Sequence, residues 1–210
     1  GGAIHEPGAT MIRQEPPSVT KSAIALAAFA LFAVLLLLGL EQWTADERNT
    51  SERAFAQARI SALIPPGTLD EDPFAEAVAL PGYTHIQQLQ AKVQGRVERI
   101  IWSGVSAPDG YSGPIDLAVA FAPSGTVLGV EVLRHRETPG LGDAIERRRG
   151  PWLQQFEGMS ENSALRLRAA GGEIDGITSA TITARAVAGA VRGAHAMFIG
   201  RTLPEREASP

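Results

Sequence analysis

The chain has 210 residues, of which 44% are hydrophobic and 20% are charged, a composition that fits one modest globular domain with an appended segment. Its net charge of −4 is not the basic surplus that neutralises phosphates, so we expect no nucleic-acid partner. Without any cysteine, the chain cannot ligate an iron–sulfur cluster, attach c-type haem or form a disulfide, and its scattered histidines predict no metal site.

The first pronounced pattern is the uncharged run AIALAAFALFAVLLLLGL at residues 23–40. As a helix it would be about 27 Å long, enough to cross a bilayer. A core helix would be shorter, and the following EQWTADERN does not resemble a signal-peptide cleavage site. With Lys21 and Trp43 at its ends, the run predicts a transmembrane anchor over residues 21–43 after a short tail at 1–20.

The soluble part begins with a predicted helical stalk at 41–64, which continues the anchor and stops at Pro65-Pro66-Gly67. Residues 68–83 are acidic and rich in turn residues, so 44–84 is interpreted as stalk and linker. Basic residues flank the span on both sides and do not decide its orientation. A short tail before a first span and a large domain after it favour a domain outside the cytoplasm.

The compact domain is predicted at 85–200 and belongs to the α+β class with an antiparallel sheet. Strands are expected at 97–105, 115–121 and 126–133, and Ser124-Gly125 predicts a hairpin between the last two. Short helices are expected at 144–149 and 152–156, a further strand at 165–169 and an amphipathic helix at 183–199. The tail at 201–210 is expected to be loose.

The segment richest in hydroxyl groups is DGITSATIT, residues 175–183, directly before the last helix. Serine and threonine at such a position commonly cap the helix, which is the simplest interpretation. The same helix start also offers unpaired amides and a positive dipole end to a phosphate, and its small neighbours leave the backbone approachable. GxGxxG and GxxxxGK[ST] motifs are absent from the sequence, so it predicts neither a dinucleotide fold nor a P-loop.

DGITSAT resembles the sequence at which certain proteins carry FMN in a phosphoester bond to the final threonine, here Thr181. APDGYSGPIDLAVAF and RHRETPGLGDAIE resemble, in order and spacing, the FMN-binding domain of the G subunits of Rnf-type complexes and of the related NqrC subunits. The likeness covers most of residues 97–199. It departs at Pro114, which removes an amide at a strand start, and at Thr178-Ser179, where these proteins often have Ser-Gly.

The resemblance implies that the flavin ring lies against the ETPGLG loop and the GYSG turn while Thr181 holds the phosphate. His135 and Tyr111 are equally compatible with packing roles. The implied cofactor-binding set is Gly110, Tyr111, Gly113, His135, Glu137, Thr138, Pro139, Gly140, Leu141, Gly142, Asp175, Thr178, Ser179, Ala180, Thr181 and Thr183.

The same resemblance implies an electron-transfer subunit in the bacterial inner membrane, with its domain in the periplasm. A flavin transferase would attach the FMN, and other membrane subunits would couple electron transfer between ferredoxin and NAD to Na⁺ or H⁺ movement. The chain would be a carrier, with no catalytic residue of its own. Three alternatives stay open: an NqrC-like subunit of a Na⁺-translocating NADH:quinone reductase, a membrane-tethered flavin reductase, and a non-redox anchor or assembly subunit.

Overall fold

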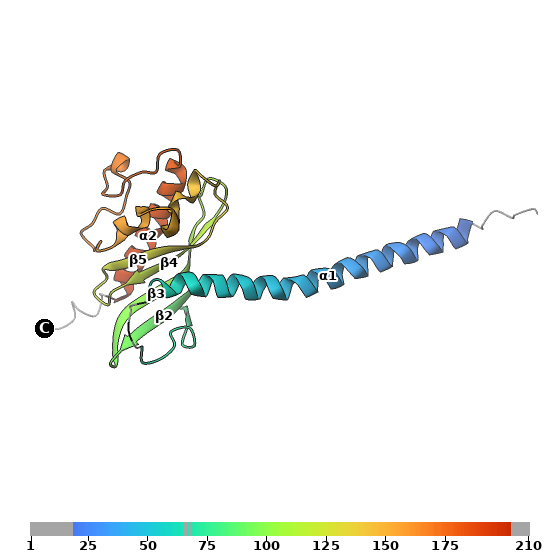
Figure 1. Ribbon diagram of the computed structural model, residues 1–210, viewed down its shortest axis with the longest axis horizontal. Coiled ribbons are helices and arrows are strands. Elements are labelled where there is room, and N and C mark those ends of the chain that lie inside the picture. The colour runs from blue at the N-terminus through green and yellow to red at the C-terminus, as the bar shows by residue number, and fades with distance from the viewer. Residues whose placement is uncertain (1–18, 65–66, 68, 203–210) are drawn as a thin grey trace, which may run out of the picture. The chain divides into compact units, whose positions relative to one another are not determined.

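The computed structural model describes residues 19–64, 67 and 69–202, and it divides the chain into two compact units, Gly1–Thr50 and Ser51–Pro210 (Figure 1). The two predicted tails lie almost entirely outside the described residues. The side chains of residues 42–53 also lie outside the description, so the predicted interfacial role of Trp43 stays a prediction.

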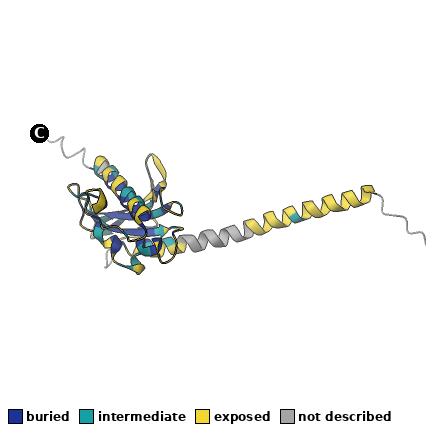
Figure 2. Cartoon of the chain, turned by 90° about the horizontal axis from the view of Figure 1, so that it is seen from above, coloured by how far each residue is buried: buried dark blue, intermediate teal, exposed yellow. Residues whose placement is uncertain are grey.

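The first element is a single helix, α1 (Val19–Ser61), which begins before the apolar run and continues beyond it to Ser61. Its segment Val19–Glu41 is long and apolar enough to cross a membrane, and none of its most apolar stretch is buried within the protein. Figure 2 shows this segment exposed on nearly all sides. A helix with leucine and phenylalanine all round its surface requires an apolar environment, which a bilayer provides.

The second unit is built on a five-stranded antiparallel sheet in which the strands follow the order of the chain. Its strands are β1 (Val78–Leu80), β2 (Tyr83–Val93), β3 (Arg96–Ala107), β4 (Ile115–Phe121) and β5 (Val127–Arg134). The predicted hairpin is confirmed, because β4 and β5 pair antiparallel across the turn that contains Ser124 and Gly125. The α+β class predicted from the sequence is confirmed as well.

Each face of the sheet carries its own apolar core, because successive strand residues point to opposite faces. On one face, Trp102 and Val119 belong to the larger core, which the second long helix, α2 (Thr181–Thr202), covers. On the other, Ile60 and Leu63 at the end of the stalk join a smaller core with Ile101 and its neighbours. The last turn of α1 is therefore part of the soluble domain.

Aromatic contacts fix α2 to the sheet. The ring of Phe198 stacks on Phe121 with centroids 4.4 Å apart and meets Trp102 edge-on at 5.4 Å. Buried His195 donates from Nε2 to the carbonyl of Gly125 at 3.0 Å, which ties the helix to the β4–β5 turn. Such buried aromatic pairs each contribute about 1 kcal/mol beyond their area. The C-terminal half of α2 is thereby held against the sheet.

Between β5 and α2 the chain forms short 3₁₀ helices: η1 (Gly142–Ile145), η2 (Arg147–Arg149), η3 (Trp152–Phe156) and η4 (Arg168–Ala170). The strand predicted at 165–169 is wrong. That segment makes only an isolated bridge from Leu167 to Ile174, since the chain turns back at Gly171, whose φ is 75°. Residues 68–83 carry β1, and β2 was not predicted as a strand.

Candidate functional site

The start of α2 has backbone amides that no side chain caps. The carbonyl of Ala180 accepts the first helical hydrogen bond, from the amide of Ala184 at 3.0 Å, so Ala180 occupies the N-cap position. Alanine has no side-chain oxygen to cap the next amides. Among the described residues, no side chain accepts a hydrogen bond from the amides of residues 181–183, and the side chain of Thr181 is exposed.

The loop before this helix is clamped at its first residue. The indole of Trp152 donates to the carbonyl of Asp175 at 2.7 Å, and the amide of Asp175 donates to the side chain of Gln155 at 2.8 Å. The Asp175 carboxylate is 2.7 Å from the guanidinium of Arg168. Near its other end, Ser179 adopts a left-handed backbone with φ 72°. The loop is therefore defined by contacts at one end and by a strained turn at the other.

Glu137 connects three segments that are distant in the chain. One carboxylate oxygen, Oε1, accepts from the amide of Ser112 at 3.0 Å, and Oε2 accepts from the hydroxyl of Thr183 at 2.6 Å. The residue is only 5% exposed. A buried carboxylate with two donors is well satisfied, and it brings the GYSG turn, the ETPGLG loop and the start of α2 to one point.

Two glycines allow this close approach. A Cβ on Gly142 would lie 2.7 Å from Cβ of Glu137, and one on Gly110 would lie 2.2 Å from the carbonyl oxygen of Gly113. Both distances are far below ordinary contact, so any larger residue would displace the carboxylate or the turn. The glycines of the two motifs therefore serve the packing around Glu137.

A cavity of about 380 Å³ opens beside this junction. Three of its lining side chains, Tyr111, Leu141 and Ile182, are large and apolar yet 69%, 49% and 48% exposed. Its lining residues are Tyr111, Glu137, Thr138, Leu141, Gly142, Ser179, Ala180, Thr181, Ile182 and Thr183. Exposed apolar side chains that surround a cavity are typical of a ligand site.

A family model described as an FMN-binding domain matches residues 110–196, which include the GYSG turn, the ETPGLG loop and DGITSAT. The chain is 34% identical over 197 residues to the G subunit of the ion-translocating oxidoreductase complex of Pseudomonas aeruginosa (strain UCBPP-PA14), covering 86% of this chain and 89% of that protein. The protein of the same name from Salmonella typhimurium is 37% identical over 198 residues, covering 89% and 95%. The chain belongs to this G-subunit family. It is an FMN-binding subunit of an ion-translocating oxidoreductase complex, as the motifs predicted.

The structure brings most of the predicted G-subunit site together. Nine predicted residues line the cavity, and Ile182 was missed because its position beside Thr181 resembles an ordinary helix residue. Ser112 was missed because it contributes only its backbone amide. Predicted residues outside the cavity lining are Gly110, Gly113, His135, Pro139, Gly140, Asp175 and Thr178.

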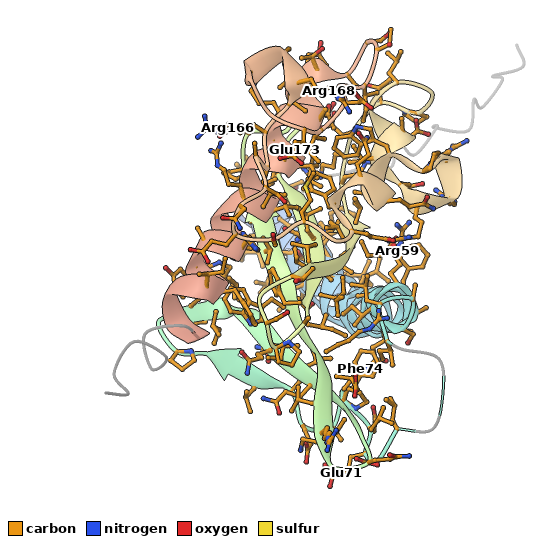
Figure 3. All side chains as sticks on the ribbon, turned by 90° about the vertical axis from the view of Figure 1, so that its left-hand side faces the viewer. Arg59, Glu71, Phe74, Arg166, Arg168 and Glu173 are labelled. Atoms are coloured by element: carbon orange, nitrogen blue, oxygen red, sulfur yellow. The ribbon has the colours of Figure 1, made fainter. Side chains whose placement is uncertain are left out.

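His135 belongs instead to a charged cluster formed by Arg59, Glu131, His135, Glu146 and Arg147. Its Nδ1 accepts from the amide of Glu137 at 3.1 Å, which requires the proton on Nε2, 3.0 Å from Oε1 of Glu146. Arg59, in the last turns of α1, reaches Glu146 at 3.2 Å and the carbonyl of Val132 at 2.7 Å (Figure 3). The cluster thus fixes the backbone from which Glu137 reaches the cavity.

The two acids of the charged cluster differ in their proton affinity. Burial raises the pKa of Glu131 more than its arginine neighbours lower it. Burial would also raise the pKa of Glu146, but hydrogen bonds from Arg148 and His135 and the charge of Arg148 bring it to about 2. Glu146 is therefore ionised at neutral pH and keeps the Nε2–H tautomer of His135.

The residues at the cavity fit FMN. The uncapped amides of residues 181–183 suit a phosphate, and Thr181 presents an exposed hydroxyl next to them. Tyr111, Leu141 and Ile182 offer apolar surface suited to a flat aromatic ring. The hydroxyl of Thr183, by contrast, is buried and donates to Glu137.

Proposed function

We propose that this protein holds FMN through a phosphoester to Thr181 and relays electrons within an Rnf-type complex. The observation that carries the proposal is the position of Thr181. Its exposed hydroxyl lies in the first, uncapped turn of α2, at the edge of a cavity whose apolar collar is formed by Tyr111, Leu141 and Ile182. In forming the ester, the Thr181 oxygen would bond to the FMN phosphorus of a flavin dinucleotide, and the pyrophosphate bond to its other nucleotide would break. That nucleotide would leave as a monophosphate and take up the hydroxyl proton, so the peptide gains FMN less one water. A flavin transferase would catalyse the reaction.

The chain's own residues would tether and orient the group. The amides of residues 181–183 would donate to the phosphate, and the collar of Tyr111, Leu141 and Ile182 would exclude water from the ring. Buried Glu137 would hold the loop and the helix start at a constant separation through Ser112 and Thr183. When bound, FMN supplies a carrier that takes up two electrons and releases them singly.

We further propose that the complex passes electrons between ferredoxin and NAD and moves Na⁺ or H⁺. The domain would lie on the periplasmic side of the inner membrane. Support comes from membership of the G-subunit family and from the single candidate span among the described residues, which carries no charged side chain between residues 22 and 40. Such a helix has no polar pathway, so ion movement belongs to other subunits. Protease protection in sealed vesicles tests the orientation.

The attachment is tested by producing the full chain together with a flavin transferase and measuring intact mass and in-gel flavin fluorescence after denaturation. We expect one FMN less a water on the native chain and none on Thr181→Ala. Thr178→Ala is the matched control, because it removes a hydroxyl of the same loop outside the cavity and should keep the flavin. An unmodified native chain beside an active transferase would contradict the proposal.

A further inference from the structure

A second and larger hollow runs along the outer face of α2. It is a groove of about 880 Å³, bounded by α2, by the beginning of β2, by the end of β3 and by the segment before η4. Ile182 lines both this groove and the cavity beside Thr181, so the groove begins where the proposed flavin site ends.

Arginines without carboxylate partners gather at this groove. Arg166, Arg185 and Arg192 line it, and none forms an ion pair with another described residue. Figure 3 shows Arg166 reaching outward beside α2. Elsewhere in the domain most arginines are paired with acids, as are Arg59, Arg134, Arg147, Arg148, Arg149 and Arg168. The groove is lined by these three arginines and by one carboxylate, that of Asp109. The groove is therefore basic, although the net charge of the chain is −4.

The floor and the wall of the groove have the composition of a protein interface. The floor is the helix face of Ala186, Gly189, Ala190 and Gly193, and a Cβ added at either glycine would meet no atom within 4 Å. Small residues four apart let the backbone of a second helix approach closely. On the opposite wall, Tyr83 and His85 form an edge-to-face pair with ring centroids 6.2 Å apart. Tyrosine and arginine are the residue types that contribute most at interfaces.

We infer that this groove docks an acidic helix presented by another subunit of the same complex. The arginines would attract the acidic side chains of the partner. The small residues of the floor would leave room for the backbone of its helix. The shared residue Ile182 places the docked partner next to Thr181, which shortens the path that electrons travel. The inference rests on the proposed electron-carrier function, because a docked redox partner can exchange electrons with this protein only if a redox group lies nearby.

The absence of cysteine from the sequence makes a direct test possible. Ala170→Cys introduces a single thiol into the chain at an exposed residue that lines the groove outside the floor. A short photoactivated benzophenone is attached to this thiol in the solubilised native complex. We expect a crosslink to an acidic segment of another subunit of that complex, identified by peptide mass. Crosslinks to lipid, to a second copy of this chain, or to nothing would overturn the inference.

Reversing the charge of the groove arginines tests whether electrostatic attraction contributes to docking. Arg185→Glu with Arg192→Glu should lower the crosslink yield about tenfold, since like charges at an interface are strongly disfavoured. Arg96→Glu, an exposed arginine outside the groove, should leave the yield unchanged. Equal yields in the double variant and in the control would contradict the proposed partner chemistry.

The mass of the Thr181 peptide is measured in the same samples. Flavin on the peptide without a crosslink overturns the docking inference alone, whereas a crosslink without flavin overturns the proposed attachment alone.

Discussion

Two polar regions, each hydrogen-bonded to Glu137, differ in whether their own hydrogen-bonding groups are paired. In the charged cluster, Arg59, His135 and Glu146 satisfy one another within the protein, and Glu146 is only 4% exposed. At the start of α2, the amides and the hydroxyl of Thr181 face outward without partners among the described residues. The charged cluster therefore supplies rigidity, while the start of α2, whose polar groups are left unpaired, supplies binding capacity.

The largest expected effect comes from breaking the charged cluster. Arg59→Met removes a cation from two buried acids, Glu131 and Glu146, and should lower the free energy of unfolding by about 4 kcal/mol. Urea unfolding of the full chain in detergent measures it. The matched control is Arg168→Met, whose partner Asp175 is exposed, with an expected loss below about 1 kcal/mol. Equal losses would show that the cluster is not the rigid region.

Acid should weaken the same cluster. The pKa of Glu146 is lowered from 4.5 to about 2 in the folded protein, so its stabilisation is present above pH 4.5 and is lost as the pH falls towards 2. The expected loss is roughly 3 kcal/mol over that interval. Glu131, whose pKa burial raises, works in the opposite direction. Unfolding free energies measured across this interval should fall steeply in the native chain and less in Glu146→Gln; parallel curves would contradict the assignment.

Two threonines in one helical turn, Thr181 and Thr183, differ in burial and in hydrogen bonding. Thr183→Val removes the buried hydrogen bond to Glu137 and should lower the free energy of unfolding by about 2 kcal/mol. Thr181→Val alters an exposed side chain and should change it by less than about 0.5 kcal/mol while abolishing the flavin ester. Urea unfolding together with flavin fluorescence measures both quantities. A stability loss in Thr181→Val similar to that in Thr183→Val would remove the distinction.

The smallest effect is expected at Ser179, whose φ of 72° suits glycine better than serine. Ser179→Gly should raise the free energy of unfolding by about 0.5 kcal/mol, because relief of left-handed strain is partly offset by the greater entropy of the unfolded chain. Urea unfolding measures this change, and flavin attachment should persist. A decrease in stability would mean that the serine makes a compensating contact.

Local patterns were enough to predict part of the fold. The alternation in 115–121, the Ser124-Gly125 turn and the apolar stripe of α2 depend on neighbours in the sequence, and all three are confirmed. β2 was missed because its sequence, YTHIQQLQAKV, mixes polar residues into both faces and has few β-branched residues. The alternation in LRLRA at 165–169 suggested a strand, but within the described domain this segment pairs only through an isolated bridge.

The site was predictable as a set of motifs but not as an arrangement. Resemblance located Thr181, Glu137 and Tyr111, all of which line the cavity. The hydrogen bonds that organise the cavity join Glu137 to Ser112 and to Thr183, which are 25 and 46 positions away in the chain. Patterns among neighbouring residues do not indicate contacts over such separations. His135 was predicted at the cofactor because it precedes ETPGLG, yet its ring points into the charged cluster, where Glu146 binds it.

Attachment at Thr181 is tested most directly by locating the flavin phosphate on the native chain, through fragmentation of the peptide that contains residues 175–185. Four hydroxyl side chains, Thr178, Ser179, Thr181 and Thr183, lie within it. We expect the mass of FMN less one water on Thr181 alone, because its exposed hydroxyl lies in the uncapped first turn beside the cavity. The same mass on Thr178, Ser179 or Thr183, or no added mass after exposure to an active transferase, would contradict it.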